Sequence, residues 1–157
     1  MTRAIESILR FVNLTTSGLL AGSLGFGEAV LMPGWQLELP STAERHAADA
    51  QVSNYFNAIG PVALGTAITL AVGSRNVRPL RRALDTATAV GLAGVLATTI
   101  MATVPINKIL EAQPANDYAS DKSQTLARNW SRAHAVRTTL GIGAFVCAVA
   151  SNLAHSK

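Results

Sequence analysis

Four long apolar stretches, separated by polar segments, dominate the pattern of the chain. They cover residues 9–31, 52–73, 83–106 and 134–154. Each is close to the length of about 20 residues that an α-helix needs to cross the hydrocarbon core of a bilayer. The second stretch is the least uniform, because Asn54, Asn57 and Pro61 interrupt its first half. The pattern predicts an all-α, integral membrane four-helix bundle that forms a single membrane domain, residues 1–157.

The composition agrees with a membrane protein and narrows its function. Hydrophobic residues make up 49% of the chain and charged residues only 14%, which is too apolar for an ordinary small soluble domain. The net charge is +4, but the basic residues are dispersed instead of forming a stripe with aromatics, so we expect no nucleic-acid partner. Cys147 is the single cysteine, which excludes an internal disulfide and a cysteine-based zinc site.

The distribution of arginines predicts an orientation in the membrane. The short segment 73–82 contains four arginines and no acidic residue, so the positive-inside rule places it in the cytoplasm. With four spans, both termini then lie on the cytoplasmic side as well. The two longer connections, roughly residues 32–51 and 107–133, face the opposite side.

Small residues within the stretches predict how the helices pack. Close helix contacts in lipid depend on small side chains, and the stretches contain several glycines suited to this role: Gly18, Gly22, Gly25, Gly27, Gly91, Gly94, Gly141 and Gly143. They fit a compact bundle within one chain. They fit equally well a surface that joins two copies, so a homo-oligomer is an alternative.

The start of the last stretch carries an unusual set of side chains. On a helix, Trp130, His134, Arg137 and Thr138 are spaced i, i+4, i+7 and i+8 and share one face. A tryptophan and an arginine are common where a helix leaves the membrane. That simpler interpretation does not account for His134.

Several other polar residues are brought to the same end of the bundle by the predicted topology. They are Glu28, His46, Asn54, Asn57 and Asn107. Each has a simpler explanation: an interfacial carboxylate, a surface histidine, or amides that cap and pack helices. Their convergence with His134 and Arg137 favours a pocket that opens away from the cytoplasm. Asn13 and Asp85 belong to the opposite end and are left out of this site.

The second half of the chain resembles a known family. The string Val104-Pro105-Ile106-Asn107-Lys108, followed by Trp130-Ser131-Arg132-Ala133-His134-Ala135-Val136-Arg137-Thr138 and a final helix with Ala144-Phe145, is similar to the anthrone oxygenase-like family of small four-span membrane proteins. Asn107, Trp130, His134 and Arg137 are the matching positions. The resemblance implies oxygenation of an anthrone-like polyphenol to a quinone with molecular oxygen and no organic cofactor.

The residues are suited to such chemistry. An anthrone C–H bond is acidic because its carbanion is a delocalised phenolate, and this anion can pass an electron to oxygen. The protein then needs a base and a group that holds the anion. We expect His134 as the base, Arg137 and Asn107 as oxyanion stabilisers, and Trp130, Asn54 and Asn57 as substrate-binding residues.

Two other classes of function fit the same residues. His46, His134 and Glu28 form a set of two imidazoles and one carboxylate that suits iron or copper, so a metal-dependent membrane oxidase is one alternative. Haem is less favoured, because its axial ligands usually lie inside a bundle. The other alternative is a non-enzymatic membrane carrier or structural protein. No nucleotide-binding loop or hydrolase motif appears, so phosphoryl transfer and classical hydrolysis have little support.

Overall fold

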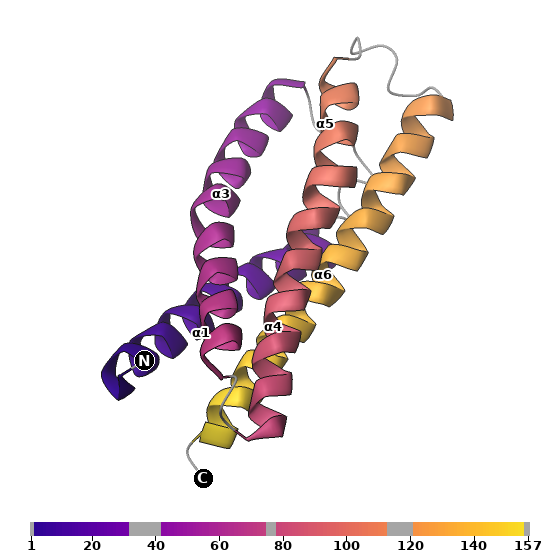
Figure 1. The fold of residues 1–157 in the computed structure, drawn as a ribbon. Coiled ribbons are helices and arrows are strands. Elements are labelled where there is room, and N and C mark those ends of the chain that lie inside the picture. The colour runs from indigo at the N-terminus through magenta and orange to yellow at the C-terminus, as the bar shows by residue number, and fades with distance from the viewer. Residues whose placement is uncertain (1, 32–41, 75–77, 113–120, 156–157) are drawn as a thin grey trace.

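The computed structural model describes residues 2–31, 42–74, 78–112 and 121–155, and its regular structure in these ranges is entirely helical (Figure 1). The elements are α1 (Arg3–Phe26) with the π-helical turn η1 (Gly27–Leu31), α3 (Thr42–Gly73), α4 (Pro79–Thr98) with the π-helical turn η3 (Thr99–Thr103), α5 (Val104–Glu111) and α6 (Asp121–His155). They form four rods, because η3 joins α4 and α5 into one. The predicted all-α four-helix bundle is confirmed.

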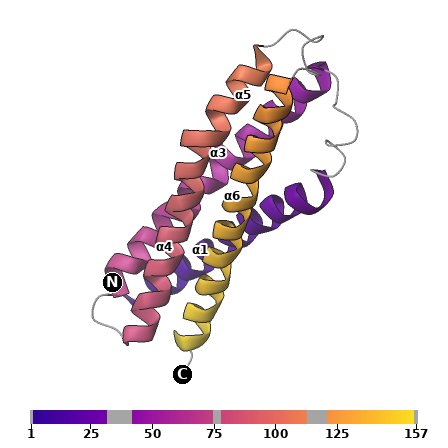
Figure 2. The ribbon, with the colours of Figure 1, turned by 90° about the vertical axis from the view of Figure 1, so that its right-hand side faces the viewer.

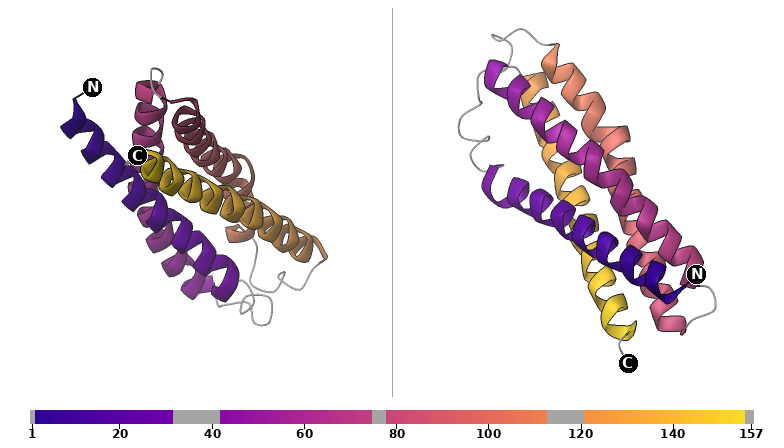
Figure 3. Two further views of the ribbon diagram at one scale, coloured as in Figure 1. Left: turned by 90° about the horizontal axis from the view of Figure 1, so that it is seen from below. Right: turned by 90° about the vertical axis from the view of Figure 1, so that its left-hand side faces the viewer.

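The rods α3, α4–α5 and α6 run alongside one another, and α1 crosses α6 obliquely (Figures 2 and 3). Both described ends of the chain lie toward the end of the bundle at which α3 ends and α4 begins (Figure 1). At the start of α1, the hydroxyl of Thr2 accepts a hydrogen bond from the Ile5 N–H. Pro79 occupies the first turn of α4, where its missing N–H leaves no bond unmade.

Two helices extend further than the apolar pattern predicts. The prediction placed residues 32–51 in a loop, yet α3 begins at Thr42, so the backbone at His46 is helical. Residues 107–133 were also predicted as a loop, yet α6 begins at Asp121 and includes Trp130. Hydropathy detects only the part of a helix that is apolar enough for lipid, and polar turns that continue it beyond the membrane look like loop.

Three helical segments of the described chain are long and apolar enough to cross a bilayer. They are Ser53–Gly73, Pro79–Ile109 and Asp121–Ala154. The stretch that contains α1 is not among them, so its crossing of the membrane stays a prediction. The surface is nevertheless that of a protein in lipid, since Phe11, Val90 and Met101 are largely exposed whereas Arg10, Asp85 and Arg137 are buried. The chain is therefore a helical membrane protein.

Glycines allow α6 to approach its neighbours closely. A Cβ atom built on Gly91 would lie 3.0 Å from the Cβ of Ala144, and one on Gly94 would lie 3.0 Å from Leu140 Cδ1. On another face of α6, a Cβ on Gly141 would lie 2.9 Å from Leu24 Cδ1. The predicted packing of small residues is thus confirmed at these positions. It is not seen at three other predicted glycines, where an added Cβ meets nothing within 4 Å: Gly22, Gly25 and Gly143.

A buried ion pair ties α1 to α4 and α6 near the chain termini. The Arg10 guanidinium donates to both carboxylate oxygens of Asp85, over 3.2 and 3.0 Å, and to Ser151 Oγ over 3.1 Å. Ser151 in turn donates to Asp85 Oδ1 over 2.5 Å. Arg10 Nε contacts Glu6, which also pairs with Arg81. Since Arg10 and Asp85 are each only 4% exposed, neither charge has water as an alternative partner.

We expect Arg10→Leu to destabilise the fold by about 3–5 kcal/mol, because it leaves the buried Asp85 carboxylate without its cation. The double variant Arg10→Leu/Asp85→Leu should recover much of this loss, since it removes both charges together. The free energy of unfolding in lipid nanodiscs measures the effect, with the exposed Arg3→Leu as control. Equal destabilisation of the single and double variants would contradict this account.

Candidate functional site

Two π-helical turns flank the same stretch of α6. η1 (Gly27–Leu31) continues α1, and η3 (Thr99–Thr103) lies between α4 and α5. In η3 the Val104 N–H bonds to the carbonyl of Thr99, five residues back. Pro105 follows directly and has no N–H to offer a carbonyl four residues back, which favours a wider turn here. π-helical turns hold well under 1% of residues and are frequent at functional sites, so two that contact the same helix mark this part of the bundle as a candidate site.

His134 and Arg137 lie at the centre of this level. Arg137 Nη2 lies 2.7 Å from His134 Nδ1, and both side chains are buried. Arg137 Nη1 reaches Thr99 Oγ1 in η3 at 3.5 Å. Its Cζ lies 5.7 Å from the centroid of the Phe56 ring on α3, in the range of a cation–π contact. Arg137 therefore joins three of the four rods at one point.

Trp130 and Asn107 cover the outer side of this pair. The Trp130 indole stacks on the His134 imidazole, with ring centroids 5.1 Å apart and planes inclined by 8°. Trp130 Nε1 donates a hydrogen bond of 2.7 Å to Asn107 Oδ1 on α5. The amide thus fixes the indole, and the indole fixes one face of the imidazole.

The first rod also approaches His134, at its Nε2 atom. Glu28 Oε2 lies 3.7 Å from His134 Nε2, which is longer than a hydrogen bond. A Cβ built on Gly27 would lie only 3.0 Å from the same nitrogen, so a glycine is needed for this approach. One turn earlier, the carbonyl of Leu24 accepts from Thr138 Oγ1 at 3.4 Å. The start of η1 is thereby held against α6.

Four buried polar atoms at this end have no hydrogen-bond partner among the residues that the structure describes. They are Glu28 Oε2, Thr103 Oγ1, His134 Nε2 and Arg137 Nε. Buried polar atoms in proteins are nearly always paired, because an unmade hydrogen bond costs about 1–3 kcal/mol. Both donors and acceptors are available here. A polar ligand that reaches this level would find partners already in place.

The structure brings together Glu28, Asn107, Trp130, His134 and Arg137, as the topology predicts. It does not bring Asn54 and Asn57 into this cluster, since both are exposed on α3 while Phe56 between them turns toward Arg137. Their predicted role in substrate binding stays a prediction. The predicted roles of the clustered residues in catalysis stay predictions too.

The metal hypothesis depends on His46, whose side chain lies outside the described residues. Within the described part of the chain, no three histidine, cysteine or acidic side chains gather as a metal-binding group. Glu28 and His134 are the two of the three predicted ligands whose positions are described, and they face one another.

Sequence reasoning missed three residues of the cluster, Phe56, Thr99 and Thr103, whereas it predicted Gly27 as a packing glycine. The two threonines are four positions apart in an apolar run just before Pro105, and this spacing puts both on one helix face. That signal was available. Phe56 gives no such signal, because one phenylalanine in an apolar stretch is ordinary.

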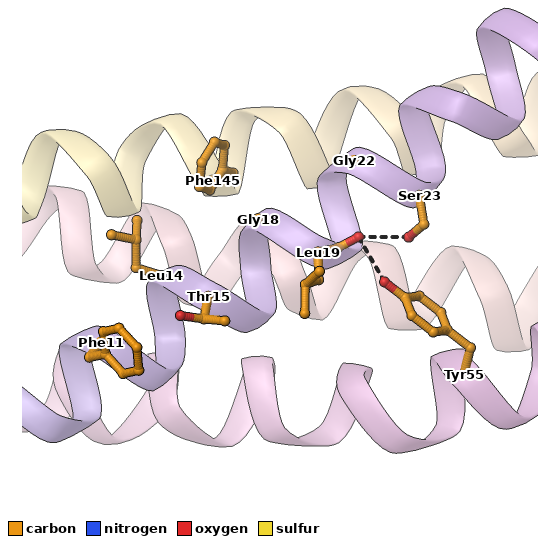
Figure 4. Close-up of a pocket in the computed structure, with 9 residues that line it drawn as sticks. All are labelled: Phe11, Leu14, Thr15, Gly18, Leu19, Gly22, Ser23, Tyr55 and Phe145. Carbon is orange, nitrogen blue, oxygen red and sulfur yellow. Dashed lines mark hydrogen bonds between the residues drawn. The ribbon is translucent and has the colours of Figure 1, made fainter.

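An open groove of about 530 Å³ follows α1 on the outside of the bundle (Figure 4). Gly18 and Gly22 leave its floor flat, and Phe11, Tyr55 and Phe145 stand along it. The Tyr55 hydroxyl donates to the Leu19 carbonyl over 3.1 Å, and the Tyr55 ring meets the Phe56 ring edge to face with centroids 5.4 Å apart. One end of the groove thus borders the ring that contacts Arg137.

The amino-acid sequence that builds this site matches the model of a known protein family. The model of the anthrone oxygenase family matches residues 52–147, which is more than half of the chain. The protein therefore belongs to the anthrone oxygenase family, as the resemblance in its second half implies. No curated protein and no solved structure matches it. The matched segment includes Asn107, Trp130, His134 and Arg137 but not Gly27 and Glu28 on the first rod.

We expect Gly27→Ala to destabilise the protein by about 1–3 kcal/mol, because the added Cβ forces the imidazole away from η1. Gly25→Ala is the matched control, since its added Cβ meets nothing within 4 Å and alanine favours a helix. Unfolding free energies of the two variants in nanodiscs give the comparison. The same change in stability at both positions would show that the contact with His134 is unimportant.

Proposed function

We propose that the protein is a membrane-embedded oxygenase that oxidises an anthrone-like or similar hydrophobic aromatic substrate with molecular oxygen. Membership in the anthrone oxygenase family supports an oxygenase role. The observation that carries the proposal is the group of buried polar atoms without partners beside the stacked Trp130 and His134 rings. A flat aromatic substrate would stack beside these rings, and its polar oxygen would pair with these polar atoms.

The reaction needs little from the protein beyond a base and an anion-binding site. Removing a proton from the central CH₂ group gives an electron-rich anion, which passes one electron to oxygen. The two radicals combine through a new C–O bond, and the peroxide takes back the proton removed in the first step. It then loses its outer oxygen with that proton and the remaining hydrogen as water. The net change converts CH₂ and O₂ into C=O and H₂O, so no other oxidant is required.

In this proposal, Arg137 holds the oxygen of the substrate on which negative charge develops, and His134 beside it is the base that the sequence predicts. A charged donor beside a buried imidazole in a site of low dielectric favours an anion more strongly than it would in water. The Asn107 amide N–H group can assist, because its oxygen is already occupied by Trp130. Trp130 supplies an aromatic surface for the substrate rings. Asn54 and Asn57 would contact the substrate only as it enters.

A metal-dependent oxygenase is the second candidate, and one observation favours it. Glu28 Oε2 and His134 Nε2 face one another at 3.7 Å, and neither has a hydrogen-bond partner in the described chain. A carboxylate and an imidazole suit iron or copper, and His46 would be the third ligand.

For the membrane, we propose four spans, both termini in the cytoplasm and a site toward the other side. Arg78, Arg81 and Arg82 at the start of α4 lie at the same end of the bundle as both described chain ends, which supports this orientation. The cluster around His134 lies further along the bundle, away from that end. An extracytoplasmic site follows from this arrangement.

The purified protein in nanodiscs should consume one O₂ per anthrone and release anthraquinone. His134→Ala should lower this rate by at least about 10²-fold, because it removes a group that acts on the reacting atoms. Thr139→Ala, exposed on the outer face of α6, should retain the rate. Oxygen uptake and the metal content are measured on the same samples.

Each other outcome selects a different function. Binding of anthrone without oxygen uptake would identify a carrier. Activity that follows iron or copper content would establish the metal-dependent alternative, whereas full activity with sub-stoichiometric metal would eliminate it. An unimpaired His134→Ala variant would remove His134 from the mechanism.

We also propose that a hydrophobic substrate reaches the site from the bilayer along the groove beside α1. The groove is mostly apolar and open to the side, and its volume lies within the range of about 300–1,000 Å³ for small-molecule sites. The contact of Tyr55 with Phe56 connects it to the residue beneath Arg137.

Gly22→Leu should raise KM for anthrone by about tenfold with little change in kcat, because the new side chain fills the groove without touching the reacting atoms. Its Cβ meets no other atom within 4 Å, so the fold should tolerate it. Gly143→Leu is the matched control, since it adds the same side chain at an equally open site that is not part of the groove. Steady-state oxygen uptake gives both constants, and an unchanged KM in Gly22→Leu would rule out this route.

A further inference from the structure

We infer that Glu28 accepts the proton that the substrate loses, and that His134 acts as a hydrogen-bond donor instead of the base. The inference deepens the proposed function and rests on it. It follows from the contacts of the two imidazole nitrogens and from the place of Glu28 beside them.

The hydrogen bond from Arg137 fixes the tautomer of His134. A guanidinium has N–H donors and no acceptor, so His134 Nδ1 must accept the 2.7 Å bond from Arg137 Nη2. The neutral ring then carries its proton on Nε2. The bond to His134 Nδ1 is the shortest described contact of Arg137. Because Arg137 is also buried, its guanidinium is held in place.

A base must offer a free lone pair, and the neutral His134 ring has none in this arrangement. Its Nδ1 lone pair is used by Arg137, and its Nε2 carries a hydrogen. Arg137 also withdraws electrons through this bond, which makes the Nε2–H group a stronger donor. His134 is therefore prepared to donate to an oxygen that becomes negative.

Glu28 has an unpaired acceptor atom, which the imidazole lacks. Its Oε2 is buried and has no hydrogen-bond partner in the described chain, and it lies 3.7 Å from His134 Nε2. That separation exceeds a hydrogen bond, so a substrate beside the pair can present its CH₂ group to Glu28 Oε2 and its oxygen to His134 Nε2. The side chain as a whole is 41% exposed, so a proton taken up by this carboxylate can exchange with solvent.

The two groups divide the first step between them. The C–H bond of the substrate breaks, its proton goes to Glu28, and its electron pair stays in the substrate as an extended enolate. The negative oxygen of the enolate accepts the Nε2–H bond of His134, with Arg137 behind it. Oxygen then takes the electrons as in the proposed reaction, and the proton held by Glu28 is returned when water forms.

The test separates proton removal from oxidation. Without oxygen, in D₂O, the protein in nanodiscs should speed exchange of the CH₂ hydrogens of anthrone with solvent deuterium, as followed by mass spectrometry. Glu28→Gln keeps the size of the side chain but accepts no proton, so it should lower the catalysed exchange rate by at least about 10²-fold. Asp121→Asn, which removes an exposed carboxylate from the first turn of α6, is the control and should exchange as the unaltered protein does.

Added acetate should restore exchange to Glu28→Ala but not to His134→Ala, because only the first variant lacks a carboxylate. Thermal unfolding of each variant verifies that it is folded. Independently of activity, ¹⁵N NMR of the imidazole should show His134 with a hydrogen on Nε2 and none on Nδ1.

Three results would overturn the inference. They are full exchange by Glu28→Gln, a hydrogen on Nδ1 of His134, and oxygen uptake on anthrone without any catalysed exchange. Failure of the proposed function itself is distinguishable, since the unaltered protein would then neither exchange anthrone hydrogens nor consume oxygen.

Discussion

Lipid offers no hydrogen bonds, and this constraint accounts for the burial of the charged side chains within the bundle. Phe11, Val90 and Met101 cover the outside, while Arg10, Asp85 and Arg137 turn inward and find partners on neighbouring helices. Because a buried cation without a partner is so costly, each arginine joins several rods at once. The same force that holds the helices together therefore builds the polar interior in which chemistry can occur.

The two buried arginine clusters differ in how completely their polar atoms are hydrogen-bonded. Around Arg10, both carboxylate oxygens of Asp85 and the hydroxyl of Ser151 are used, so the cluster is closed. Around Arg137, the Nε atom and His134 Nε2 lack hydrogen-bond partners in the described chain. A closed set stabilises a fold, whereas a set with open positions can receive a ligand. This contrast, more than the presence of charge, distinguishes the candidate site from a structural ion pair.

The apolar pattern was sufficient to predict the fold, and helical spacing was sufficient to place Trp130, His134 and Arg137 on one face. It was not sufficient for Asn54 and Asn57, whose direction depends on how α3 is turned about its axis, nor for the pairing of Arg10 with Asp85 across 75 positions. Which residues so far apart in the sequence come into contact is decided by the packing of the helices. The first rod shows the same limit, since the approach of Gly27 to His134 depends on how this rod packs against α6.

The π-helical turns also change the meaning of the hydrophobic pattern on either side of them. A turn closed by a bond five residues back holds one residue more than an α-turn, so the stripe of inward positions moves around the axis by about 100°. In the rod from Pro79 to Glu111, residues before Thr99 and after Thr103 therefore follow two separate phases of one period. Deleting one residue within η3 would restore a continuous α-helical period along the rod and rotate Asn107 away from Trp130.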